Sequence, residues 1–157
     1  MDVITIGLVS DTHGLSRPSI AVALAGVSLI IHAGDVGGGA VLHELGAIAP
    51  VRAVFGNVDP PLPPLEARLS LELGGLSIHV SHGHELGAPT AEKLLAFYRA
   101  DILIFGHTNK PLVYRDGARL VVNPGAAGPR RFNLKPSVAR LVIANGEATA
   151  EIIPLPE

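Results

Sequence analysis

The segment VITIGLVSDTH at residues 3–13 and the segment LIIHAGD at residues 29–35 decide the fold. Each is an apolar, β-branched run of strand length that ends in or just before an aspartate. Between them, Pro18 precedes a short apolar stretch at 20–24, and proline is favoured at the start of a helix. The pattern therefore predicts a strand, a helix and a second strand, a unit whose two strands pair in parallel.

The alternation continues with a helix predicted at 40–48 and a third buried strand at 51–55. After four prolines within residues 60–64, apolar runs are instead paired around short glycine-containing turns. These turns predict three hairpins, centred on Gly74-Gly75, Asp116-Gly117 and Asn145-Gly146. A helix that Thr90 caps and that runs to about residue 99, together with a buried strand at 102–105, completes the second half.

Composition limits the class of protein. A length of 157 residues corresponds to about one domain, so we expect residues 1–157 to form a single domain. With 48% hydrophobic and 17% charged residues the chain is not disordered, and a net charge of −2 argues against bulk electrostatic binding of nucleic acid. The absence of cysteine excludes thiol catalysis. The longest apolar run, 20–31, is too short to cross a membrane, and Asp2 stands where a signal peptide carries basic residues; we therefore expect a soluble cytoplasmic protein.

Polar side chains concentrate where strands are predicted to end. The five motifs are Asp11-Thr12-His13, Gly34-Asp35, Gly56-Asn57-Val58-Asp59, Ser81-His82-Gly83-His84 and Gly106-His107-Thr108-Asn109. Each alone also fits turn chemistry, but ligands of α/β sheets bind at the carboxyl ends of strands, where all five lie. Carboxylate, imidazole and amide together suit Mn²⁺, Fe or Zn²⁺ better than Ca²⁺. A central aspartate with ligands on both sides suggests a two-metal hydrolase.

In this order the five motifs resemble those of the calcineurin-like metallophosphoesterase superfamily, and in particular its small bacterial and archaeal phosphodiesterase branch. Asn123-Pro124-Gly125 is similar to a late signature of that branch, and the resemblance covers about residues 3–153. It implies an α/β fold in which a two-sheet β-sandwich is flanked by helices in four layers, α/β/β/α. It also implies a phosphodiesterase that activates water with a dinuclear metal centre and acts on a small phosphodiester or phosphomonoester.

The resemblance further implies two divalent metal ions, with Mn²⁺ favoured and Ni, Fe, Zn or Mg as alternatives. The implied ligands are Asp11, His13 and Asp35 for the first metal, and Asn57, His82 and His107, with Asp35 as the bridge, for the second. The last ligand of the first site is usually the second histidine of a Gly-His-Thr-His motif. Here that position is Asn109, whose neutral amide is a weaker donor, so we expect the first-site metal to be labile.

Four further roles are expected. Asp35, as the bridging ligand, and His84, as the proton donor to the leaving group, are the candidate catalytic residues, with His13 as an alternative donor. Related branches place a histidine where this chain has Val58, so a leaving group of low pKa is favoured. Arg130 and Arg131 are candidate substrate-binding residues, because arginine binds phosphate bidentately; a solvated surface pair is the alternative.

Three neighbours of the motifs are expected to support the site. Asp59 is expected to brace the loop that carries Asn57. Asn123 either orients a metal-ligating histidine or caps the Pro-Gly turn that follows it. His32 either hydrogen-bonds within the site or is a satisfied core histidine.

A second class of function remains open, because the same fold with altered ligands serves as a non-catalytic scaffold subunit of the retromer coat. The Asn109 difference is a step in that direction. Against it, the remaining ligands would be costly to bury without metals. The positive mean hydropathy, +0.41, leaves a homo-oligomer as a further alternative.

Overall fold

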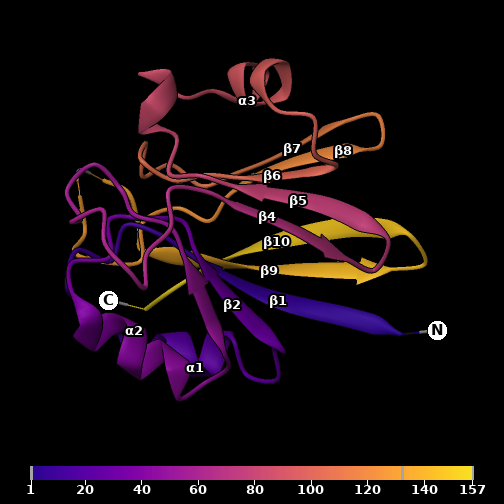
Figure 1. Cartoon of the computed structure of the whole chain (residues 1–157). Helices are drawn as coiled ribbons and strands as arrows, with labels where there is room; N and C mark the ends of the chain where they lie inside the picture. Colours follow the sequence, from indigo (N-terminus) through magenta and orange to yellow (C-terminus); the bar gives the residue numbers. More distant parts are fainter. Residues whose placement is uncertain (1, 132, 157) are drawn as a thin grey trace.

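The computed structural model, which describes residues 2–131 and 133–156, consists of two five-stranded β-sheets packed face to face, with helices on both outer faces (Figure 1). The first sheet contains, in spatial order, β10 (Glu147–Pro154), β9 (Ser137–Ala144), β1 (Val3–Val9), β2 (Leu29–His32) and β3 (Val51–Ala53). The second contains β4 (Leu69–Leu73), β5 (Leu76–Val80), β6 (Ile102–Ile104), β8 (Arg119–Asn123) and β7 (Leu112–Asp116). The four-layer sandwich implied by the resemblance is therefore confirmed.

The first sheet is built around β1. It pairs in parallel with β2, which pairs in parallel with β3, as the alternating pattern predicts. Its other edge pairs antiparallel with β9 of the third hairpin, so the sheet is mixed. Two helices, α1 (Ser19–Ala23) and α2 (Gly39–Gly46), cover the outer face (Figure 1).

Strand β3 is shorter than predicted. It ends at Ala53 because Val54 forms an isolated bridge with Glu66, and the Phe55 N–H donates to the carbonyl oxygen of Glu66 at 2.9 Å. The apolar run thus continues with partners on both sides, because the Val54 N–H still donates to the carbonyl oxygen of His32 in β2 at 3.1 Å.

The second sheet has a parallel centre, formed by β5, β6 and β8, with β4 and β7 added by hairpins. Helix α3 (Ala91–Phe97) covers its outer face (Figure 1). As expected, the Thr90 hydroxyl accepts from the Lys93 N–H at 3.1 Å. The helix ends two residues earlier than predicted, where the Arg119 guanidinium donates to the carbonyls of Leu95 and Tyr98.

The main core lies between the two sheets. Buried side chains of β1 and β2, such as Leu8 and Ile31, share one cluster with Ile78 of β5, Ile104 of β6 and Val122 of β8. Burial of this apolar surface is the main force that holds the sheets together. The packing brings the carboxyl ends of both parallel sets to the same edge of the sandwich. Within residues 2–131 and 133–156, no helix has the length and apolar character needed to cross a membrane.

Candidate metal centre

The loops that follow the parallel strands are bonded to one another through their backbones. The Asp11 N–H donates to Gly34 O at 2.9 Å, and the His13 N–H donates to Asp35 O at 3.0 Å. Within the second sheet, the Gly106 N–H donates to His82 O at 3.0 Å, and the His107 N–H that follows donates across to Asp11 Oδ2 of the first sheet at 3.2 Å. The motifs predicted from the strand ends therefore meet at one edge.

The backbone is strained where the predicted ligands lie. Five of the six described non-glycine residues with positive φ belong to the predicted site: Asp11 (53°), His13 (45°), Asp35 (55°), His107 (72°) and Asn109 (64°). The sixth, Asn145, lies in the turn of the third hairpin. Such conformations cost about 1–3 kcal/mol each and cluster at functional sites, where the surroundings hold them in place.

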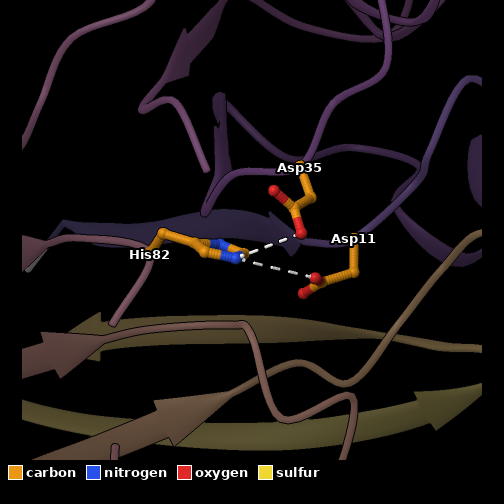
Figure 2. Close-up of side chains that lie close together, drawn as sticks. All are labelled: Asp11, Asp35 and His82. Carbon is orange, nitrogen blue, oxygen red and sulfur yellow. Dashed lines mark ion pairs between the residues drawn. The ribbon is translucent and has the colours of Figure 1, made fainter. Parts of the chain in front are cut away.

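Three buried side chains form the centre of the site (Figure 2). Asp11, Asp35 and His82 each offer a ligand atom, and these atoms lie within 4.8 Å of one another. His82 Nε2 lies 3.3 Å from Asp35 Oδ2 and 3.9 Å from Asp11 Oδ1. His82 Nδ1 donates to the carbonyl oxygen of Ala33 at 2.7 Å, because a carbonyl can only accept. This bond directs Nε2, which has no hydrogen-bond partner, toward the two carboxylates, as in a metal-ligating histidine.

A second imidazole approaches the same two oxygens. His13 Nε2 lies 3.6 Å from Asp35 Oδ2 and 3.9 Å from Asp11 Oδ1. His13 and His82 come from different sheets, after β1 and β5 respectively. One carboxylate oxygen from each aspartate is thus shared by two imidazoles, an arrangement that suits two neighbouring cations.

The other oxygen of each carboxylate is held by the protein. Asp11 Oδ2 accepts from the Ser10 hydroxyl at 2.6 Å and from the His107 N–H at 3.2 Å. Asp35 Oδ1 accepts from the Val58 N–H at 3.2 Å. These bonds turn the remaining oxygens toward the centre. Sequence reasoning missed Ser10, whose sole signal is its position directly before Asp11.

The electrostatics keep at least one carboxylate ionised. Burial acts to raise the pKa of Asp35, but the nearby His82 imidazole, with the Val58 N–H, lowers that pKa to about 2. Burial raises the pKa of Asp11, and His82 and Ser10 oppose it. Burial acts to lower the pKa of His82, yet Asp35 and Asp11 raise it overall. The centre therefore attracts positive charge.

A cavity of about 310 Å³ opens above this centre. Its lining residues are Asp11, His13, Asp35, Asn57, Val58, His107, Asn109 and Arg131. It thus collects the predicted ligands other than His82, which is fully buried. The amide oxygen of Asn109 is buried and has no hydrogen-bond partner, as expected of an oxygen that faces a cation.

Besides His82, two predicted site residues do not line the cavity. Arg130 precedes Arg131 but is not part of the lining. His84 is not part of the lining either, and its ring centroid lies 5.4 Å from that of His82 and 6.3 Å from that of His107. Its Nδ1 atom is buried without a hydrogen-bond partner. His84, which follows β5 of the second sheet, is therefore close to two predicted ligands but is not among the residues that line the cavity.

Two supporting residues fix the loops. The Asp59 carboxylate accepts from the N–H groups of Val36, Gly37 and Gly56 at 2.8 to 3.1 Å, so it braces the loop rather than facing the cavity. The Asn123 amide caps the Pro-Gly turn, which is one of the two alternatives expected for it, and it is also bonded to the residue before His107. It donates to the Gly106 carbonyl and accepts from the Gly125 N–H in the turn.

His32 is a neutral histidine with a defined tautomer. Its Nδ1 accepts from the Gly34 N–H at 3.1 Å, so Nε2 carries the proton and donates to the Thr12 hydroxyl at 2.9 Å. That hydroxyl donates to the Val36 carbonyl at 2.7 Å. Burial lowers the pKa of His32 to about 3. Both expectations for His32 are thus met, since it is satisfied in the core and links the loops that carry Asp11 and Asp35.

Comparison with known proteins gives a consistent family. The profile of the calcineurin-like phosphoesterase superfamily domain matches residues 4–146. A probable metallophosphoesterase of Methanothermobacter thermautotrophicus is 34% identical over 94% of this chain and 91% of its own. A phosphodiesterase of Methanocaldococcus jannaschii is 29% identical over 76% of this chain and 82% of its own.

The fold is also that of solved structures. Wild-type Vps29 of Entamoeba histolytica, crystallised with Zn²⁺, superposes with a TM-score of 0.76. It is 23% identical, and the match covers 96% of this chain and 99% of the other. At this identity the likeness is one of fold.

We expect a His32→Gln variant to lose part of the acid sensitivity of the protein. In the folded state the pKa of His32 is about 3, whereas in the unfolded chain it is near 6.5. As the pH falls below 6.5, the unfolded chain binds a proton that the folded protein does not, so stability decreases. This adds up to about 1.4 kcal/mol per pH unit to the slope of the unfolding free energy. Urea unfolding between pH 6.5 and 4 should show a shallower slope for the variant, and the wild-type slope for the control His43→Gln, at an exposed position of α2. Equal slopes for His32→Gln and the wild type would contradict the assignment.

A Gly56→Ala substitution should disrupt metal binding without touching a ligand. A Cβ at this position would lie 2.0 Å from Asp35 Oδ1 and 2.4 Å from Asp35 N, so the aspartate must move. We expect the affinity for Mn²⁺ to fall at least about tenfold, as for other losses of ligand support. Titration calorimetry on folded protein measures this. Gly46→Ala, at a helical position with open space around it, is the matched control and should bind Mn²⁺ normally.

Proposed function

The chain belongs to the calcineurin-like phosphoesterase superfamily, and from that premise we propose that it is a phosphodiesterase with a dinuclear metal centre. The observation that carries the proposal is the buried His82 Nε2, which faces the carboxylates of Asp11 and Asp35 and has no hydrogen-bond partner. Two buried carboxylates beside an unpaired nitrogen are costly unless a cation joins them. The phosphodiesterase of Methanocaldococcus jannaschii among the relatives supports the choice of reaction.

The donors present fit two divalent ions. Asp11, His13, Asp35 and Asn109 would hold one ion, and Asp35, Asn57, His82 and His107 would hold the other. Mixed oxygen and nitrogen donors favour Mn²⁺ over Ca²⁺, with Ni, Fe, Zn or Mg as alternatives. When bound, such ions lower the pKa of a coordinated water toward neutrality and stabilise charge on phosphoryl oxygens.

The protein's own groups position the substrate and move protons. Arg131, on the wall of the cavity, would donate to the phosphoryl oxygens, which bear growing negative charge. His84 would hold the proton for the leaving group, with His13 as the alternative donor. Val58, which is 59% exposed beside the ligands, cannot supply a proton. We therefore expect esters with good leaving groups to react fastest.

The cavity suits a small substrate. Its volume is about 310 Å³, and all of its lining side chains except that of Val58 are polar. A phosphodiester or phosphomonoester of modest size fits these dimensions, because pockets for small molecules fall in this range.

A non-catalytic scaffold is the second candidate, and one observation favours it. Asn109 stands where the family has a histidine, and an amide is a weaker ligand for ions such as Mn²⁺ or Zn²⁺. If the first ion were lost altogether, catalysis would be lost, while the protein surface that a scaffold uses to bind partners would remain. The experiment below separates the two candidates.

Hydrolysis of bis(p-nitrophenyl) phosphate is the deciding measurement. The protein is treated with a chelator and reloaded in parallel with Mn²⁺, Ni²⁺, Zn²⁺ or Mg²⁺. We expect turnover to return with metal, highest with Mn²⁺, and kcat to drop by about 10³ in Asp35→Asn, since the bridging charge is removed. Asp116→Asn, at the exposed end of β7 directly before the hairpin turn at Gly117, should retain full activity. Absence of turnover with every metal, in folded protein that binds the metal, would favour the scaffold.

Replacing Asn109 by histidine should tighten the first metal site. The φ of 64° is tolerated by histidine better than by most residues, and imidazole is a stronger donor than an amide. We expect the weaker of two Mn²⁺ dissociation constants to fall about tenfold or more in calorimetric titration. Asn109→Ala, which offers no donor, should raise it. An unchanged constant in both variants would show that Asn109 does not ligate.

A further inference from the structure

A segment far along the chain is bonded to the loop that carries Asp11. The Ala127 N–H donates to Ser10 O at 2.9 Å, and the Gly128 N–H donates to Asp11 O at 3.2 Å. A Cβ on Gly128 would lie 2.2 Å from the carbonyl oxygen of Thr12, so the backbones touch. Because Asp11 also donates to Gly34 O, its strained backbone is held from both sides.

This segment continues to the cavity. Three residues after Gly128, Arg131 lines the same cavity as Asp11 and Asp35. We call residues 126–131 the arm. The place of Arg131 relative to the metal ligands depends on how firmly the arm is held against the Asp11 loop.

The side chain of Arg17 also binds the arm through hydrogen bonds. Arg17 Nε donates to the carbonyls of Ala127 and Gly128 at 3.2 and 3.3 Å, and Nη2 donates to the Gly128 carbonyl at 3.0 Å. Arg17 follows the Asp11 motif closely, whereas its acceptors are more than a hundred residues away. It is half-buried, so these bonds are partly shielded from water. The planar guanidinium can serve both carbonyls at once, which an ammonium group does less well.

We propose that Arg17 is a positioning residue that fixes the arm, and with it Arg131, against the metal ligands, so that a phosphoryl group can contact both. The proposal rests on the proposed function in one respect, because it takes the occupant of the cavity to be a phosphate or phosphate ester. Arg17 itself does not touch the occupant. Its effect passes through the carbonyls of Ala127 and Gly128 to the position of Arg131.

The test is the binding of inorganic phosphate to Mn²⁺-loaded protein, measured by calorimetry, which needs no turnover. In Arg17→Lys we expect the dissociation constant for phosphate to rise about fivefold to tenfold. The positive charge remains, but the planar guanidinium that donates to both carbonyls is lost. The Mn²⁺ dissociation constants should stay within about twofold, because the ligands keep their own bonds. In hydrolysis assays KM should rise while kcat changes little.

A double-mutant cycle shows whether Arg17 acts through Arg131. Arg131→Ala alone should weaken phosphate binding, and adding Arg17→Lys should then have no further effect, because coupled residues are not additive. The matched control is Arg140→Lys. Arg140 on β9 likewise donates to two carbonyls at 3.0 Å, but these belong to Ala23 and Ala25 at the end of α1 rather than to the arm. It should lower the melting temperature at most and leave phosphate binding unchanged.

Several outcomes would overturn the inference. These are unchanged phosphate binding in Arg17→Lys, additive effects in the cycle, or no phosphate binding by the wild-type protein. The failure of the proposed function looks different. In that case no metal supports hydrolysis, while phosphate binding and its coupling between Arg17 and Arg131 persist. Conversely, hydrolysis without coupling would leave the phosphodiesterase standing and remove the role of Arg17.

Discussion

The structure is organised around the burial of two aspartates within a few ångströms of each other. Asp11 and Asp35 are almost fully buried, and such a pair is stable only if each carboxylate is supplied with donors. The chain supplies Ser10 and backbone N–H groups to one oxygen of each, and directs the other toward imidazoles. Positive φ at five site residues is the conformational cost of bringing these groups together. Nearly every other feature of this edge serves that arrangement.

The centre also joins the two sheets. The aspartates follow β1 and β2 of the first sheet, whereas His82 follows β5 of the second, and its Nδ1 is tied to Ala33 of the first. A cation bound here would therefore cross-link the layers that the apolar core already holds together. Because metal binding of this kind adds its free energy to folding, the site and the sandwich stabilise each other.

Much of this could be predicted from the sequence, and the exceptions have a common cause. Alternating apolar runs and glycine turns predicted the strands and hairpins, because these depend on local periodicity and turn chemistry. The five motifs predicted the residues around the cavity, since strand ends place side chains at one edge. Local pattern did not predict that β9 would pair with β1, or that Val54, just after β3, would form a bridge with Glu66. Both pair segments that are distant in the sequence, and such pairings are not specified by local periodicity.

The same distinction explains which site residues escaped notice. Aspartate and histidine at strand ends can be identified as candidate ligands from their chemistry. Ser10 and Arg17 are common residue types, and their importance depends on what they contact in the fold. Ser10 matters because its hydroxyl donates a hydrogen bond to Asp11 Oδ2. Arg17 matters because its guanidinium donates to two carbonyls more than a hundred residues away. The glycines near the centre belong to this class. Gly56 and Gly106 are required by close approach rather than by turn geometry, since a Cβ at either would meet a carboxylate oxygen of Asp35 or Asp11 within 3 Å. Motifs thus identify the candidate donors of a metal centre. The exact positions of those donors depend on other residues, which can be identified only once the fold brings distant segments into contact.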